Sequence, residues 1–332
     1  MKRLIQIVVG IAVSVGALVW AFREIDLDRF TEAFTSISWI PIVPFVVLYL
    51  LHFLFRALRW RLLLPDTEGE RPTIRTLFDS IMLGNLATFL LPFRLGEFIR
   101  PLVLTRWSPY RFGAAFVSVV IERFFDLSSA LLSLVIVLSF IPSMPDWLQY
   151  TVYALGTMAS GLLVFLVCGC LLPKQIESLV VIFLRPLPKS ISNPLNRFLI
   201  DLIHGAGVIR TPTRLLAILT LTFVVWATTF LQFYALLFIF PGENSSISLA
   251  MTLGVFVALA VAAPSVPGFL GVFQLGCVAA FQLFSYPAAA AQVYSIVTHG
   301  LTYLFIVGTG TIILMSRNLN LLELKRAVEK TD

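Results

Sequence analysis

Charged side chains are scarce in this sequence. Only 13% of its 332 residues are Asp, Glu, Lys or Arg, whereas 58% are hydrophobic and the mean hydropathy is +0.93. Soluble domains carry roughly a quarter charged residues, which cover the surface that faces water. So small a charged fraction excludes an ordinary soluble domain, and apolar runs extend from Leu4 to Met315. We therefore predict an all-α polytopic membrane protein that forms one integral membrane domain over residues 1–332.

Several chemical signals are absent as well. The three cysteines, Cys168, Cys170 and Cys277, lie in apolar surroundings, so we expect neither a disulfide framework nor a metal site. The sequence contains no Walker motif, no cluster with metal-ligand spacing and no nucleophile motif, so we expect no cofactor and no enzyme activity. The formal net charge of +6 has an explanation in membrane topology, so we expect no nucleic-acid partner.

Six apolar stretches are long enough to cross roughly 30 Å of hydrocarbon as helices of about 20 residues. They cover residues 4–22, 39–55, 113–140, 150–172, 215–240 and 288–315. The first could also be a signal peptide, but it lacks a small-x-small cleavage site, so we interpret it as a retained span. Two further apolar stretches, 76–111 and 247–284, are interrupted near the middle by proline and glycine, which is typical of broken or re-entrant hairpins.

The basic residues follow this topology. Nineteen of the 24 lysines and arginines fall in regions that six spans would place on one side, namely the termini, 56–75, 106–111 and 174–214. The loops on the other side hold only Arg23 and Arg29. Because cytoplasmic loops are enriched in lysine and arginine, we predict that both termini are cytoplasmic. Residues 174–210 are predicted to form helices that lie in the cytoplasmic interface.

The two interrupted stretches share a sequence pattern. Residues 92–98 and 267–273 both read P-x-x-L-G-x-F, 175 positions apart, and a long apolar run follows each. In the predicted topology the halves 76–140 and 247–315 enter the membrane from opposite sides, as do the inverted repeats of many secondary transporters. Chance similarity is the alternative. The residues expected to shape the hairpin backbones are Pro92, Gly96, Pro267, Gly268 and Gly271.

Six charged residues lie within the predicted membrane region. Arg94, Glu97 and Arg100 follow one another at steps of three, which places them on one stripe of a helix that begins near Pro92. The second group, in the next span, consists of Glu122, Arg123 and Asp126. A charge at the bilayer centre costs at least about 2.5–3.5 kcal/mol. We therefore expect the six to face one another or a wet cavity.

Two roles for these charges remain open. They could form a salt-bridged network that fixes the first hairpin against the next span. Alternatively, Arg94 and Arg100 could bind an anionic ligand, since guanidinium groups offer paired hydrogen-bond donors to phosphate. His299 in the last span lies 176 positions after Arg123 and is a further binding candidate.

Three motifs resemble a known family. They read L-P-F-R-L-G-E-F-I-R at 91–100, E-R-F-F-D at 122–126 and V-P-G-F-L-G-V-F at 266–273. In this order they resemble the flippase-like transmembrane domain of lysylphosphatidylglycerol synthases, and the resemblance covers most of the chain. The sequence departs from that family at Gln274, where the family often has an acid, and at His299, where it often has an arginine. These departures leave open a different ligand in the second half.

The resemblance implies a lipid transporter or flippase, because only 17 residues follow Met315 and leave no room for an aminoacyl-transfer domain. We expect it to move an anionic phospholipid or a lipid-linked substrate, such as a polyprenyl phosphate or a glycolipid, through a polar midplane cavity. The expected substrate-binding residues are Arg94, Glu97, Arg100, Glu122, Arg123, Asp126 and His299.

Two other functions stay open. One is a membrane-embedded transferase or phosphatase acting on a lipid-linked substrate, and the other is a non-transporting partner that regulates another membrane enzyme. The short loops and the resemblance together imply a prokaryotic cytoplasmic membrane. The sequence does not identify the lipid, the direction of movement, the coupling ion or the oligomeric state.

Overall fold

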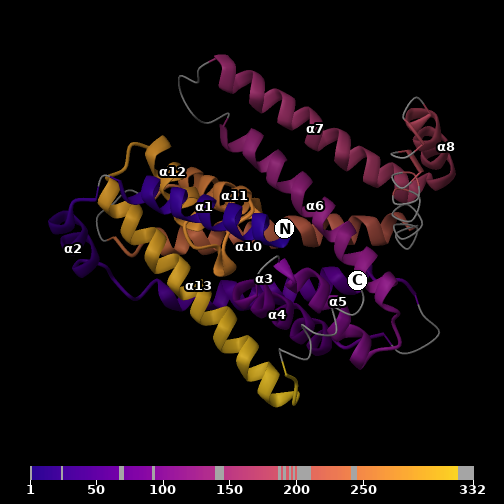
Figure 1. Ribbon diagram of the computed structural model, residues 1–332, viewed down its shortest axis with the longest axis horizontal. Coiled ribbons are helices and arrows are strands. Elements are labelled where there is room, and N and C mark those ends of the chain that lie inside the picture. The colour runs from indigo at the N-terminus through magenta and orange to yellow at the C-terminus, as the bar shows by residue number, and fades with distance from the viewer. Residues whose placement is uncertain are drawn as a thin grey trace.

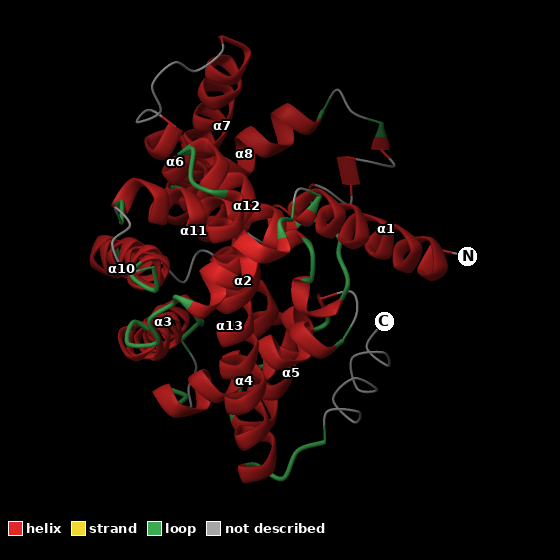
Figure 2. Ribbon diagram, turned by 90° about the vertical axis from the view of Figure 1, so that its left-hand side faces the viewer, coloured by secondary structure: helices red, strands yellow, loops and turns green. Residues whose placement is uncertain are grey.

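A computed structural model describes residues 2–23, 25–66, 71–91, 94–138, 146–185, 211–240 and 245–320, with isolated positions between 188 and 199. All regular structure in this part of the chain is helical, as Figure 2 shows. The prediction of an all-α membrane protein is therefore confirmed. A helix satisfies its backbone N–H and C=O groups within one segment, which a hydrocarbon environment requires.

Long helices occupy all six predicted spans. They are α1 (Lys2–Phe22), α3 (Ile42–Leu63), α6 (Phe112–Leu138), α7 (Asp146–Leu171), α10 (Pro212–Leu237) and α13 (Ala288–Ser316). Among the described residues, α3, α10 and α13 are each long and apolar enough to cross a membrane. A fourth candidate is α1 together with α2 (Leu27–Thr35), which is bent from it by 86°. Helix α6 has 27 residues but contains three charged ones.

Helix α3 is longer than the span predicted at 39–55. It continues to Leu63, and the side chain of Arg59 within its last two turns is 0% exposed. The predicted end of this span was therefore wrong: Arg56 and Arg59 lie within α3 and not after it, while their cytoplasmic side stays a prediction. An arginine pair normally signals the end of a membrane span, but here carboxylates on α6 neutralise the pair and allow the helix to continue.

Both interrupted stretches fold as helical hairpins. The first hairpin consists of α4 (Ile74–Leu90) and α5 (Gly96–Trp107). The second consists of α11 (Ile247–Ala262), the short 3₁₀ helix η3 (Pro267–Phe269) and α12 (Val272–Leu283). A long helix follows each hairpin, α6 in the first case and α13 in the second. The inverted orientation of the two halves stays a prediction.

Two apolar cores correspond to the two hairpins. The first packs around α4 and α5 and includes Trp60, Leu83 and Phe125. The second packs around α11 and α12 and includes Phe281 and Tyr294. Helix α13 contacts α12 of one hairpin and α4 of the other, and Figure 1 shows it running diagonally past both. This helix therefore joins the two halves.

Two short helices complete the described structure. Helix α2 was not predicted; the Asp26 carboxylate caps its N-terminus by accepting hydrogen bonds from the backbone N–H groups of Asp28 and Arg29. Helix α8 (Pro173–Leu184) falls at the start of the predicted interfacial region 174–210. Most of the remainder of that region lies outside the described residues, so its interfacial position stays a prediction.

Candidate functional site

A buried carboxylate, Glu122 on α6, lies at the centre of the charged residues. Its side chain is 0% exposed and accepts hydrogen bonds from Arg56 Nη2 at 3.0 Å, Arg100 Nη2 at 2.7 Å and Arg123 Nη2 at 2.9 Å. Arg59 Nη2 lies 3.2 Å from the same side chain. Four arginines from α3, α5 and α6 therefore share one carboxylate. Removing such a partner leaves several charges buried without compensation.

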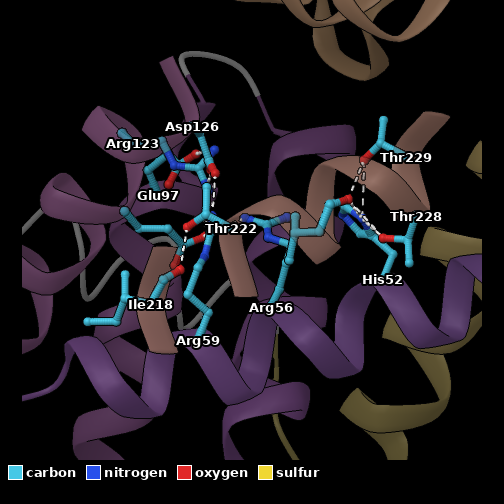
Figure 3. A network of polar contacts seen from close by, with 12 residues as sticks. His52, Arg56, Arg59, Glu97, Arg123, Asp126, Ile218, Thr222, Thr228 and Thr229 are labelled. Atoms are coloured by element: carbon cyan, nitrogen blue, oxygen red, sulfur yellow. Dashed lines mark hydrogen bonds and ion pairs between the residues drawn. The ribbon is translucent and has the colours of Figure 1, made fainter. Parts of the chain in front are cut away.

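Two further carboxylates extend this arginine cluster, part of which Figure 3 shows. Asp126 lies 2.7 Å from Arg59 Nη1 and 3.4 Å from Arg123 Nη2. Glu97 of the first hairpin lies 3.8 Å from Arg123 Nη1, and both of these side chains are about 40% exposed. The arginine cluster, as named here, comprises Arg56, Arg59, Glu97, Arg100, Glu122, Arg123 and Asp126. It ties the first hairpin to α3 and α6.

Arg100 is buried between a carboxylate and an aromatic ring. Besides its bond to Glu122, its guanidinium lies 3.8 Å from the centre of the Trp60 ring, which is within the range of a cation–π contact. The Trp60 indole N–H in turn donates to Ser118 Oγ at 2.9 Å. Arg100 and Glu97 also line a water-sized pocket of about 10 Å³ between α4 and α5. Neither residue lines the large cavity described below.

Arg94 differs from the other arginines. It precedes α5 with a positive φ of 52°, so it does not share a helical stripe with Glu97 and Arg100, and that prediction was wrong. The physical reason is that the helix begins at Gly96 and not near Pro92, which lies outside the described residues. Arg94 forms no ion pair among the described residues, and its guanidinium lies 5.4 Å from the centre of the Phe269 ring.

A cavity of about 520 Å³ adjoins the arginine cluster. One end is charged and is lined by Arg56, Arg94, Arg123 and Asp126. Much of the remaining wall is apolar and comes from the first helix of the second hairpin, through Gly254, Val257, Ala258, Leu259, Val261 and Ala262. The cavity is therefore amphipathic, with charge at one end and hydrocarbon along the side.

The balance of charge around this cavity is positive. Three arginines, Arg56, Arg94 and Arg123, and one carboxylate, Asp126, line its charged end, which leaves an excess of two positive charges. Arg94 supplies one of these charges; Glu97 interacts with it electrostatically, but no carboxylate among the described residues forms an ion pair with it. An anionic group entering the charged end would find donors already in place.

The sequence analysis missed several polar residues that line the cavity. His52 Nδ1 lies 3.3 Å from both Thr228 Oγ1 and Thr229 Oγ1. Gln232 donates to the backbone carbonyl of Leu48 at 3.4 Å. Thr298 and Thr302 contribute from α13. The only signal in the sequence was the recurrence of Thr and Gln within apolar runs, and threonine in a membrane helix more often bonds to its own backbone.

His299 does not reach the arginine cluster or line the cavity. It is 4% exposed, and its Nε2 lies 2.7 Å from the carbonyl oxygen of Gly268 while its Nδ1 lies 2.9 Å from Gln274 Nε2. His299 thus binds the bend of the second hairpin. Its ring also stacks on Phe273, which lines the cavity, with 4.5 Å between ring centres.

The predicted hairpin glycines lie where the backbone needs them. Gly268 and Gly271 have positive φ values of 76° and 88° in the bend that follows Pro267. A Cβ at Gly271 would lie 2.2 Å from the carbonyl oxygen of Ser14 on α1. A Cβ at Gly96 would lie 1.9 Å from the carbonyl oxygen of Gly84, so α4 and α5 approach each other closely there.

Within the described ranges, no group of three or more His, Cys, Asp or Glu side chains lies close enough together to hold a metal ion.

The family described as the lysylphosphatidylglycerol synthase TM region matches residues 7–310. Comparisons with curated proteins and with solved structures each found no match.

Proposed function

Because the chain belongs to the lysylphosphatidylglycerol synthase transmembrane family, we propose that it moves a lipid with an anionic headgroup across the membrane. The amphipathic cavity carries this proposal. Its charged end suits a phosphate, and its apolar wall suits the start of acyl or polyprenyl chains. Ligand sites of about 300–1,000 Å³ hold molecules of drug size, so the cavity would enclose a headgroup while the chains stay in the bilayer.

Arg94 is the residue we expect to contact the headgroup first. The charges of Arg59 and Arg100 are already engaged by buried carboxylates. Arg94 lines the cavity without such a partner among the described residues, so phosphate binding there breaks no existing ion pair. Arg56 and Arg123 line the same end and would add donors. Glu122 then acts as a structural anchor for the arginines that surround it.

A vesicle assay tests this proposal. The purified chain is reconstituted with fluorescent anionic or zwitterionic phospholipids, and the pool protected from an external quencher is followed with time. We expect faster loss of protected anionic lipid with the wild type than with empty vesicles, and loss of this acceleration in Arg94→Ala. The matched control is Arg106→Ala, an exposed arginine at the other end of α5.

The same vesicles distinguish transport from chemistry. Mass spectrometry of the recovered lipid should show the starting molecule unchanged. A new lipid product that requires the protein would instead establish a membrane-embedded transferase or phosphatase. No acceleration with any tested phospholipid, in a folded sample, would overturn transport of phospholipids and turn attention to polyprenyl phosphates or to regulation of a partner enzyme.

We further propose a prokaryotic cytoplasmic membrane with both termini on the cytoplasmic side. The concentration of lysine and arginine on one side of the predicted spans supports this orientation. A single cysteine introduced at Asn320, in a variant that lacks the three natural cysteines, should react with a membrane-impermeant maleimide only after the cells are opened.

A further inference from the structure

Three hydrogen bonds form a continuous chain across the bend of the second hairpin. The Gly271 N–H donates to Gln274 Oε1 at 2.8 Å. Gln274 Nε2 lies 2.9 Å from His299 Nδ1, and His299 Nε2 lies 2.7 Å from the Gly268 carbonyl oxygen. Gln274 is 5% and His299 4% exposed, so water does not readily replace any of these bonds.

The two backbone groups at the ends determine which atoms carry protons. A backbone N–H only donates, so the Gln274 atom that faces Gly271 must be the amide oxygen. A carbonyl oxygen only accepts, so His299 Nε2 must carry a hydrogen. The Gln274 NH₂ group then donates to the lone pair on Nδ1. The arrangement therefore requires a neutral imidazole with its proton on Nε2.

A second proton on His299 is incompatible with this chain. It would add to the lone pair of Nδ1, give the ring one positive charge and place an N–H against the Gln274 NH₂ group. Rotating the amide by half a turn would repair that contact but would place NH₂ against the Gly271 N–H. One of the three bonds must therefore break, and the bend of the hairpin has to move.

This bend contacts the charged end of the cavity. Phe269, inside the bend, lies against the Arg94 guanidinium at 5.4 Å and against the Phe89 ring at 5.5 Å. Phe273, the second residue of α12, stacks on His299 and lines the cavity. Movement of the bend would therefore reach the headgroup region from two sides.

Few ionisable groups lie around His299 to compensate an added charge. Residues 8–22 of α1, which packs on this hairpin, include no ionisable side chain, and those of α2, which packs on α13, are exposed. On α4, Asp79 is paired with Arg317. The remaining ionisable groups of the packed elements are Arg75 on α4, Arg214 and Tyr234 on α10, Cys277 on α12, Tyr294 and Tyr303 on α13, Tyr49 on α3, whose ring lies 4.7 Å from that of Phe305 on α13, and Arg94 beyond Phe269.

We infer that His299 is a proton-binding site whose occupation opens the bend of the second hairpin and so couples proton uptake to the headgroup site beside Arg94. The inference rests on the proposed function, because it names the proton as the ion coupled to lipid movement. The proton enters from water, resides on Nδ1 while the bend is open, and leaves when the three hydrogen bonds re-form.

Hydrogen–deuterium exchange of the purified full chain tests the switch directly. Between about pH 8 and about pH 5, after correction for intrinsic exchange rates, we expect the backbone of 264–276 to exchange about tenfold faster in the acidic sample. His299→Gln should abolish this difference. The control is His52→Gln with His204→Gln, which leaves His299 as the only histidine of the three and should keep the response.

A second variant keeps the test decisive if His299→Gln does not fold. In Gln274→Glu, the carboxylate accepts from the Gly271 N–H and also from a protonated Nδ1, so low pH should protect the bend instead of opening it. Equal protection of wild type at both pH values, or a response that persists in His299→Gln, would overturn the inference.

This exchange measurement is independent of transport, so its failure is distinguishable from failure of the proposed function. In vesicles that do transport lipid, an imposed pH gradient should accelerate the wild type and leave His299→Gln unchanged. A gradient response in His299→Gln would contradict the coupling while leaving lipid transport intact.

Discussion

The two hairpins have the same construction and different chemistry. In each, two helices meet at a break and a long helix follows. The first hairpin is joined to its long helix by charges, through Arg100 with Glu122 and Glu97 with Arg123. The second is joined to its long helix by neutral groups, through Gln274 and His299. A shared backbone plan therefore does not impose a shared binding site.

This comparison assigns different tasks to the two halves. The charged half provides the positively charged end of the cavity, and α11 of the neutral half provides much of its apolar wall. Two arginine-rich halves would leave little hydrocarbon surface for a lipid chain. A molecule with a charged headgroup and an apolar chain therefore matches the two unequal halves better than a small hydrophilic anion does.

Glu122→Gln should produce the largest effect, since it leaves four arginines around a neutral amide. Breaking a buried ion pair in this way costs about 3–5 kcal/mol, and the loss would fall on the contacts between the first hairpin, α3 and α6. The unfolding free energy of the detergent-purified protein measures this loss. Glu32→Gln on the exposed face of α2 is the control. A loss below about 1 kcal/mol would show that the charges do not hold this half together.

Gly271→Ala should be the most damaging small change in the second hairpin. The residue has a φ of 88°, and its new Cβ would overlap the Ser14 carbonyl of α1. We expect a loss of at least about 2 kcal/mol in unfolding free energy. Gly300→Ala on α13, where a Cβ meets nothing within 4 Å, should cause no loss. An equal loss of unfolding free energy in Gly271→Ala and Gly300→Ala would contradict the role of this bend.

Arg94→Ala should separate binding from stability in the first half. A hydrogen bond to a charged group contributes about 1.5–3 kcal/mol, so affinity for a short-chain anionic phospholipid should fall at least about tenfold. The unfolding free energy should change by less than about 0.5 kcal/mol, because Arg94 has no ion pair to lose. Titration with the phospholipid measures the affinity, and unfolding of the same sample measures the stability. A large loss of stability would make Arg94 a structural residue.

Glu97→Gln should have the smallest effect. Its carboxylate lies 3.8 Å from Arg123, and both side chains are about 40% exposed. Exposed pairs of this kind contribute less than about 1 kcal/mol, and Arg123 keeps its contacts with Glu122 and Asp126. The difference in unfolding free energy between Glu97→Gln and wild type should be nearly the same at low and at high salt. A strong salt dependence would place Glu97 among the structural charges.

Much of the fold could be predicted from the sequence, because apolar length and interrupting prolines and glycines are local signals. All six predicted spans contain long helices, and both interrupted stretches are hairpins. The end of the second span was misplaced. Arg56 and Arg59 have the sequence of a cytoplasmic flank, and only the distant carboxylates on α6 explain why they are buried.

The candidate site was predicted in part for the same reason. Charges inside apolar runs stand out in the sequence, and Glu122 and Arg123 do contact the first hairpin, whereas Asp126 pairs with Arg59 and Arg123. The separation of Arg94 from Arg100 could not be predicted, because it depends on the residue at which α5 begins. His299 was grouped with the charges by its offset from Arg123, but its contacts are set by the bend at Gly268.

The central claim is that the cavity binds an anionic lipid headgroup beside Arg94. Photocrosslinking tests it most directly, with an anionic phospholipid that carries a photoreactive group near its phosphate, followed by mass spectrometry of the labelled peptides. The account predicts labelling of peptides that contain Arg94 and the cavity-lining part of α11, reduced by Arg94→Ala and unchanged by Arg106→Ala. Labelling confined to the outer faces of the helices, or unaffected by Arg94→Ala, would contradict it.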